Sequence, residues 1–232
     1  INSDFKPQVI SLSVNNEGNY VTNKISANGA IGFGVNTFDN MTNPYNKNGI
    51  YKVSAFVNGV PYFSYKFDTF SFDESKHINY FMDYYRFKNL GQRFQKMFID
   101  NDYPLSIVNG NKKNGILKVQ PSASYTYKIV VEDFSQNKST IEIPIVFKEA
   151  DLSKKEVESS NKKIKAKNDY LFEEGKWTIN FSANTFYEDF RMKLKVSEDT
   201  LYLHEDEIPV KNSFTISCDI SNLDAETKNK SF

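Results

Sequence analysis

The sequence predicts an all-β chain: an antiparallel immunoglobulin-like β-sandwich with a partly helical, partly irregular insertion, followed by a second, smaller β-sandwich module. Three observations lead to this prediction. Aromatic residues, which favour strands, make up 15% of the 232 residues, and Gly and Pro number only 10 and 7. Apolar and polar residues alternate in several short segments, which is the period of a half-buried strand. Asn-containing turns separate these segments.

The net charge and the distribution of apolar residues argue against some classes of partner and against a transmembrane helix. Lys and Arg together number 29, as do Asp and Glu, so the formal net charge is zero. A basic excess is typical of nucleic-acid binders and of proteins held on anionic membranes, and we expect neither here. No apolar run approaches the roughly 18 residues of a transmembrane helix. Because the chain starts at Ile1 without a start methionine or a signal-peptide pattern, we expect it to be a section of a longer protein.

Residues 1–150 are predicted to form the first sandwich. Gln8 to Val14 alternates as a strand, and Lys24 to Asp39 is a second candidate strand, interrupted by three closely spaced glycines. A bulged strand explains these glycines better than a phosphate cradle does, because neither a helix start nor a Lys-Ser/Thr pair follows them.

A hairpin over Tyr51 to Phe67 is the clearest local signal. Asn58-Gly59 is the favoured pair for a two-residue turn, and it would place Val57 opposite Val60. With strict alternation, both faces of this hairpin are apolar, so we expect both faces to be covered. One face would carry Tyr51, Val53, Ala55, Val57, Val60 and Tyr62, and the other Phe56, Phe63, Tyr65 and Phe67.

An insertion near residues 73–115 follows this hairpin. Ile78, Phe81, Met82 and Tyr85 have helical spacing, and Ser71 with Glu74 suggests a capping box. A second hairpin then closes the domain: Tyr125 to Val131 and Ile141 to Phe147 alternate on either side of a turn from Asp133 to Asn137.

Residues 151–169 are charged and poor in apolar side chains, which predicts a linker. Residues 170–232 are predicted to form a second β module, either a small sandwich or part of one that continues beyond Phe232. We expect the single cysteine, Cys218, to point inward in this module. Its expected strands are Trp177 to Phe181, Arg191 to Val196, Leu201 to Leu203 and Phe214 to Ile220.

No catalytic residue, metal ligand or cofactor site is predicted. A hydrolytic zinc site needs three closely arranged ligands, whereas the only histidines, His77 and His204, lie far apart in sequence. A Gly-x-Ser-x-Gly elbow is also absent from the sequence. The loop Asp100-Asn101-Asp102 offers oxygen ligands for calcium, with an ordinary turn as the alternative.

Several segments resemble the non-catalytic region that follows the peptidase domain in M23-family (lysostaphin-like) metallopeptidases of Bacteroidetes. The similarity covers most of the chain, as a pattern of strands and turns. It is carried by Lys6 to Leu12, Lys47 to Tyr51, Val57 to Val60, Phe70 to Asn79, Asp83-Tyr84, Pro104 to Ser106, Trp177 to Phe181, Asn184 to Asp189, Leu203-His204 and Ile208 to Val210.

The resemblance implies a cell-envelope or secreted location and a parent protein that cleaves peptidoglycan with zinc. Its catalytic motifs do not map onto this chain. We therefore expect a non-catalytic region that positions or docks the parent in an envelope assembly, with a protein partner or its own upstream peptidase domain as the binding target. The alternative is a glycan- or peptidoglycan-binding module that uses exposed tyrosines as stacking platforms. The candidate tyrosines are Tyr62, Tyr80, Tyr84, Tyr85 and Tyr103.

Overall fold

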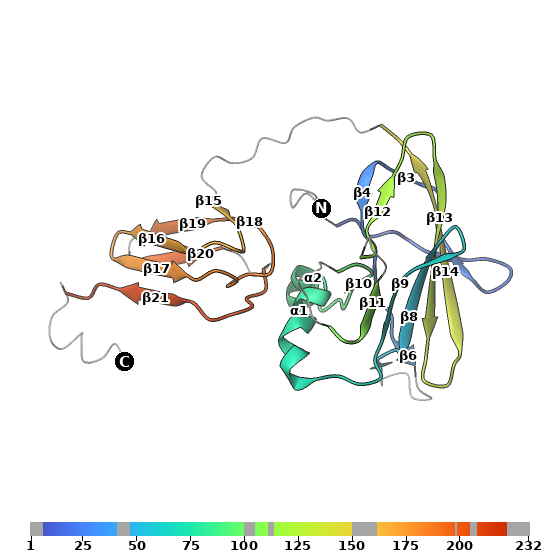
Figure 1. The fold of residues 1–232 in the computed structure, drawn as a ribbon, viewed down its shortest axis with the longest axis horizontal. Coiled ribbons are helices and arrows are strands. Elements are labelled where there is room, and N and C mark those ends of the chain that lie inside the picture. The colour runs from blue at the N-terminus through green and yellow to red at the C-terminus, as the bar shows by residue number, and fades with distance from the viewer. Residues whose placement is uncertain are drawn as a thin grey trace. The chain divides into compact units, whose positions relative to one another are not determined.

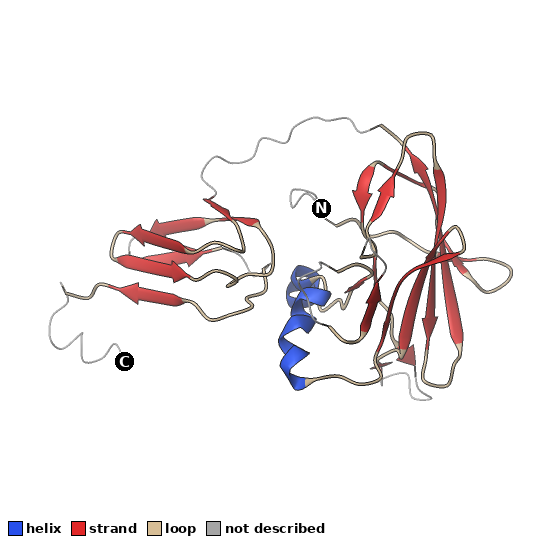
Figure 2. Cartoon of the chain, in the orientation of Figure 1, coloured by secondary structure: helices blue, strands red, loops and turns tan. Residues whose placement is uncertain are grey.

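The computed structural model describes residues 7–40, 47–99, 105–110, 114–149, 162–197, 199–204 and 208–221. Strands dominate these ranges, and the helices among them are short (Figures 1 and 2). The all-β fold class predicted from the sequence is therefore confirmed. The chain divides into two compact units, Ile1–Lys154 and Lys155–Phe232, each with its own hydrophobic core.

The first unit is built on an eight-stranded sheet with the strand order β1-β2-β14-β13-β8-β9-β11, and β3 also lies beside β14. Its strand pairs are antiparallel, except that β2 and β3 run parallel to β14. The strands are β1 (Ser13–Val14), β2 (Tyr20–Val21), β3 (Ile25–Ala27), β8 (Lys52–Val57), β9 (Val60–Lys66), β11 (Val108–Gly110), β13 (Ser124–Glu132) and β14 (Lys138–Phe147).

One face of this sheet forms the core. Along β13, Tyr127, Ile129 and Val131 are buried at alternate positions, and β14 repeats the alternation from Ile141 to Ile145. Since successive side chains of a strand point to opposite faces, these residues share one face. The predicted second hairpin is confirmed by the continuous antiparallel register between β13 and β14.

Short strand pairs form a second layer over the core face. They are β4 (Gly29–Ile31) with β12 (Leu117–Val119), and β5 (Gly34–Val35) with β10 (Gln95–Lys96). A further pair joins β6 (Asp39–Asn40) to β7 (Lys47–Asn48). The ring of Phe33 packs 4.3 Å from that of Tyr127, centroid to centroid, which joins the two layers. The stretch predicted as one bulged strand is thus divided between the large sheet and this second layer.

The glycines of that stretch allow close packing. A Cβ added to Gly32 would lie 2.4 Å from Cδ1 of Phe98, and one added to Gly34 would lie 3.3 Å from the backbone oxygen of Gln95. The segment containing β10 therefore lies directly against these glycines. Packing accounts for Gly32 and Gly34 without a phosphate ligand, whereas Gly29 lies in open space with a φ of +64°.

The predicted insertion contributes to the core. Phe81 and Met97 are 2% and 0% exposed and pack in the main hydrophobic cluster. The expected helical spacing is broken at Met82, whose backbone is extended. Between residues 72 and 90 the chain therefore forms three short helices: the 3₁₀ helix η1 (Phe72–His77), α1 (Ile78–Phe81) and α2 (Tyr84–Leu90).

The hairpin of β8 and β9 pairs Val57 with Val60, as predicted, but its two faces differ from the prediction. A register shift between Ala55 and Phe56 leaves Tyr62 as the extra residue of a β-bulge. The shift brings Phe63 onto the same face as Ala55. The prediction of two equally apolar faces is therefore wrong: the core face gains the aromatic residues, and the opposite face is largely polar.

The described residues of the second unit form three small antiparallel sheets. Ile179 and Phe181 are 0% and 1% exposed and form part of its core. The sheets are β15 (Lys162–Ile164) with β18 (Phe190–Met192); β16 (Tyr170–Glu174), β17 (Trp177–Phe181) and β21 (Thr215–Cys218); and β19 (Leu194–Ser197) with β20 (Thr200–Leu203).

The second unit begins earlier in the chain than predicted. Strand β15 lies inside the segment 151–169 expected to be a linker, and its Ile164 is 1% exposed in the core. Ile164 is the one apolar residue of this strand and is preceded by two lysines, so the composition of the segment gives no indication of a buried strand. Cys218 is half-buried opposite Trp177 on the edge strand β21, rather than fully inside.

Candidate interaction surface

The five candidate tyrosines do not form one exposed platform. Tyr62 and Tyr80 are only 8% and 6% exposed, so the prediction that they offer stacking surfaces is wrong. Tyr84 is half-buried, and Tyr85 is exposed. Tyr103 lies outside the described residues, as does the candidate calcium loop. Tyr85 is therefore the one member of this set that the described structure exposes to a partner.

Two long-range contacts explain the burial of these tyrosines. The bulge in β9 turns Tyr62 inward, where its hydroxyl donates a 2.6 Å hydrogen bond to the carbonyl oxygen of Ile116. Burial, with a smaller effect of Tyr125, raises the pKa of Tyr62. The ring of Tyr80 is covered by Lys96, whose Nζ lies 3.9 Å from the ring centroid. Both rings serve the internal packing of the first unit.

Helix α2 has well-defined ends and exposes its side chains. The Asp83 carboxylate accepts a 3.1 Å hydrogen bond from the backbone N–H of Arg86, which caps the first turn. Gly91 ends the helix with a φ of 65°, the left-handed conformation that glycine adopts without strain. No residue of α2 is fully buried. Tyr85 and Leu90 are 45% and 53% exposed, so the helix presents apolar area to the solvent.

Cationic side chains surround this apolar area. The segment from residue 84 to 98 contains four Lys or Arg residues and no Asp or Glu. The guanidinium carbon of Arg86 lies 5.6 Å from the ring centroid of Phe94, and that of Arg93 lies 5.8 Å from that of Phe87. Cation–aromatic contacts of this kind hold a cation near a ring without neutralising its charge. Arg86 also pairs with Asp83, whose Oδ2 lies 3.4 Å from Nε, whereas Lys88 and Arg93 make no ion pair with the residues that the structure describes. We define the helix surface as Tyr85, Arg86, Lys88, Leu90 and Arg93.

A second exposed aromatic residue stands at the start of η1. Phe72 is 95% exposed, although the helix it begins is firmly attached. The Ser71 hydroxyl caps this helix by accepting from the N–H of Asp73, whereas the Glu74 carboxylate accepts from both the N–H and the hydroxyl of Ser106, at 2.9 Å each. The predicted capping box is therefore only half formed, because Glu74 bonds to a distant loop instead of its own helix.

The histidines have structural positions. His77 is buried, and Nδ1 of His204 accepts a hydrogen bond from the backbone N–H of Lys193 at 3.2 Å. Within the described ranges, no three His, Cys, Asp or Glu side chains lie close enough together to hold a metal ion. None of the helices in those ranges combines the length and apolar character needed to cross a membrane.

Sequence reasoning missed Phe72, Leu90 and the cations of the helix surface as candidate partner contacts. The run of residues 84–98 without an acidic side chain was a visible signal for the cations. The exposure of Phe72 and Leu90 had no comparable signal, since it depends on which distant segments cover each side chain.

The fold and this surface together define an all-β chain of two units, the first of which carries an exposed apolar and basic helix. Comparison with protein-family models, with curated proteins and with solved structures finds no match.

Proposed function

We propose that this chain is a non-catalytic interaction region of a cell-envelope protein, and that it docks a protein partner through the helix surface. The resemblance noted in the sequence supports a parent that is an M23-type zinc metallopeptidase of Bacteroidetes, or a relative that lacks the catalytic domain. The partner is then an envelope protein or the parent's own peptidase domain. The location is the periplasm, the outer membrane or the cell exterior.

The observation that supports this proposal is the exposure of a well-capped helix. Helix α2 is held at both ends, by Asp83 and Gly91, yet buries none of its side chains fully. Protein interfaces are enriched in exposed aromatic side chains and arginine, and a few such residues carry most of the binding energy. Tyr85 and Arg93 are exposed and match this composition, and Leu90 adds exposed apolar area. The partner's surface should be acidic around an apolar centre.

A protein partner fits this surface better than a glycan does. Two of the five tyrosines expected to stack on sugars lie in the core. Leu90 offers a sugar no hydrogen bond, and the cations of the helix surface favour an anionic partner. Peptidoglycan is the alternative partner, and within the described structure only Tyr85 of the candidate tyrosines is exposed enough to stack on it.

We also assign the first unit to the immunoglobulin-like sandwiches. The neighbouring strands β14, β13, β8 and β9 have the antiparallel order of G, F, C and C′ in those folds, and the pair β4–β12 corresponds to B and E. Such sandwiches are common in cell-surface proteins, where they support binding loops and insertions. This assignment supports a role for the sandwich as a scaffold. In this proposal, the insertion determines which partner is bound.

Site-specific photocrosslinking in the native cell tests the docking proposal. A crosslinking amino acid replaces Tyr85, and a control replaces Val60, an apolar residue that is 64% exposed at the hairpin tip. We expect a discrete protein adduct from position 85 and none from position 60. The adduct identified by mass spectrometry is then purified and titrated against the full chain.

Charge reversal supplies the quantitative criterion. Lys88→Glu with Arg93→Glu should weaken binding of that purified protein by at least about tenfold, which corresponds to ~1.4 kcal/mol. The association rate should also fall as salt is added. No adduct from position 85, or affinity unchanged by the reversal, would contradict the proposal.

A further inference from the structure

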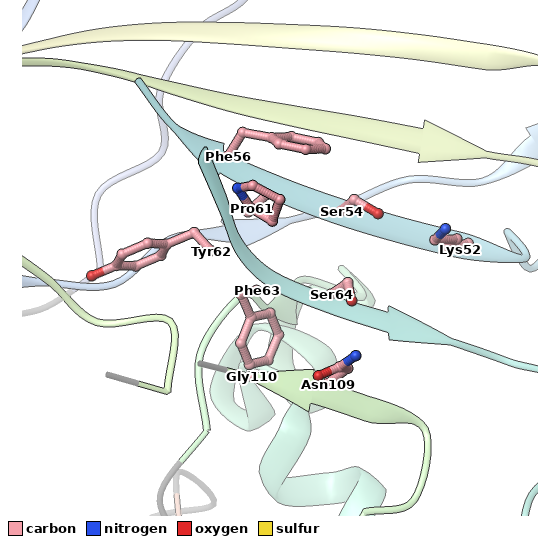
Figure 3. A pocket seen from close by; sticks show the side chains of 10 residues that line it. Lys52, Ser54, Phe56, Pro61, Tyr62, Phe63, Ser64, Asn109 and Gly110 are labelled. Atoms are coloured by element: carbon pink, nitrogen blue, oxygen red, sulfur yellow. The ribbon is translucent and has the colours of Figure 1, made fainter. Parts of the chain in front are cut away.

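The polar face of the large sheet contains a shallow groove that none of the preceding functions uses. It has a volume of about 250 Å³ and crosses β8, β9 and β11 (Figure 3). The register shift between Ala55 and Phe56 bends the hairpin locally, because a bulge increases strand twist. Gly110, on the edge strand β11, has no side chain to fill the far wall. The groove is also bordered by Tyr62 and Phe63 at the bulge (Figure 3). The side chains that line it on the polar face are Lys52, Ser54, Phe56, Pro61, Ser64 and Asn109.

Three short polar side chains form a row across the groove. Ser54 is paired with Ser64, and Ser64 with Asn109, so the three lie on one face of adjacent strands. Neighbouring strands are about 4.8 Å apart, a step comparable with the length of one pyranose ring. In the described part of the chain, none of these three side chains has a hydrogen-bond partner. The row therefore offers two hydroxyls and an amide to a ligand.

Apolar and charged groups lie on opposite sides of this row, along the direction of β8 (Figure 3). Phe56 is paired with Pro61, which places a ring face and a pyrrolidine ring side by side. At the other end of β8 is Lys52, which makes no ion pair with the residues that the structure describes.

The charged groups around Lys52 already have partners. Opposite Lys52 on β9, Lys66 is bound to Asp68 at 2.7 Å. Opposite it on β13, Glu132 is bound to Lys138 at 3.4 Å. Lys52 is therefore available to an anionic ligand at one end of the groove.

We propose that this groove binds a short acidic oligosaccharide. Sugar hydroxyls bond to Ser54, Ser64 and Asn109, the C–H face of one ring lies on Phe56 and Pro61, and a sugar carboxylate pairs with Lys52. Amphipathic ligands of this kind need neutral donors and acceptors beside an aromatic face. An extended peptide would instead use free backbone groups at a sheet edge. The backbone groups of β8 and β9 are already paired within the sheet, so a peptide would have to pair with the outer edge of β11. The tetraglutamate peptide in the test below addresses that edge.

The test is a titration of the full chain with tetragalacturonate, an acidic sugar, and with cellotetraose, a neutral one, followed by backbone amide chemical shifts. We expect saturable binding of the acidic sugar, with shifts in β8, β9 and β11, and much weaker binding of the neutral sugar. Ser64→Ala with Asn109→Ala should weaken both by about tenfold or more. Lys52→Gln should weaken only the acidic sugar, by a similar factor.

Lys118→Gln is the matched control, because it removes one positive charge from an exposed position of β12 in the same unit. It should leave the acidic affinity unchanged, and circular dichroism confirms that each variant is folded. The proposal is overturned if neither sugar saturates, if Lys118→Gln acts as strongly as Lys52→Gln, or if a tetraglutamate peptide binds as tightly as the acidic sugar. The groove contains no residue of the helix surface. A negative result for sugar binding therefore does not contradict protein docking through the helix surface, and the reverse also holds.

Discussion

Replacing Gly115 with alanine tests how closely its backbone packs against Met97 and Phe98 of the insertion and against Phe63 of the large sheet. The φ of Gly115 is +83°, and a Cβ there would lie 2.2 Å from the carbonyl oxygen of Met97 and 2.7 Å from Cα of Phe98. Those two obstacles are backbone atoms, which cannot rotate away as a flexible side chain can. The third, Cδ2 of Phe63, lies 2.9 Å away and belongs to a buried ring.

The expected loss of stability follows from two terms. A residue other than glycine in the left-handed region costs about 1–2 kcal/mol, and overpacking costs about 1–3 kcal/mol. We expect the free energy of unfolding of the first unit to fall by roughly 3–4 kcal/mol. With an m-value of about 2 kcal/mol/M, the urea midpoint should fall by roughly 1.5–2 M.

Gly59→Ala is the matched control. The φ of Gly59 is +81°, and no atom lies within 4 Å of an added Cβ, so this substitution carries the backbone term without the overlap. Urea unfolding is followed by near-ultraviolet circular dichroism of tyrosine, since 11 of the 14 tyrosines lie in the first unit. Fluorescence of the single tryptophan, Trp177, reports on the second unit. A midpoint for Gly115→Ala no lower than that for Gly59→Ala would refute the close approach.

Three further predictions concern single side chains. Tyr65→Phe removes a 2.6 Å hydrogen bond from the tyrosine hydroxyl to Oε1 of Gln95, and should lower the free energy of unfolding by about 1 kcal/mol in the same urea assay; an unchanged midpoint would contradict this. Hydrogen bonds from Asn137, first from its side chain, lower the pKa of Asp133. Ionised Asp133 therefore stabilises the fold above its unfolded pKa, and this contribution disappears as the pH falls through the folded pKa. When urea midpoints are measured over a series of acidic pH values, Asp133→Asn should remove the part of the decrease that is due to Asp133. Burial raises the pKa of Tyr187 to about 12. The stability that protonated Tyr187 contributes is complete below the unfolded pKa of about 10 and is lost as the pH rises through the folded pKa. Tyr187→Phe should therefore reduce the fall in the urea midpoint of the second unit at alkaline pH, measured by tryptophan fluorescence.

Local signals predicted much of the fold. Asn58 and Gly59 both have positive φ, at 50° and 81°, as the two-residue turn requires. The alternation of β13 and β14 predicted which side chains enter the core, because a strand that is buried on one face has a period of two. The helical segment was predicted in kind but not in detail. Its capping contact from Glu74 goes to Ser106, 32 residues away, which no local pattern contains.

The candidate sites were less predictable. Exposure of a tyrosine depends on what covers it, and Tyr62 is covered through a hydrogen bond to a residue 54 positions away. The groove depends on the register of three strands, which brings Asn109 beside Ser64 and Ser54. A bulge of one residue decides this register. The alternation of apolar and polar residues in the sequence is equally compatible with a regular hairpin that has no bulge.

By itself, the sequence determined the strand-rich class, the turns at Asn58 and Asn137 and the balance of charge, because backbone propensity and side-chain alternation act between near neighbours. Only the tertiary structure decided which aromatic rings became core and which stayed exposed. It also decided which polar side chains met across β8, β9 and β11. The physical reason is that burial and cross-strand pairing are contacts between distant segments, and a one-residue shift in register moves a side chain to the opposite face of the sheet.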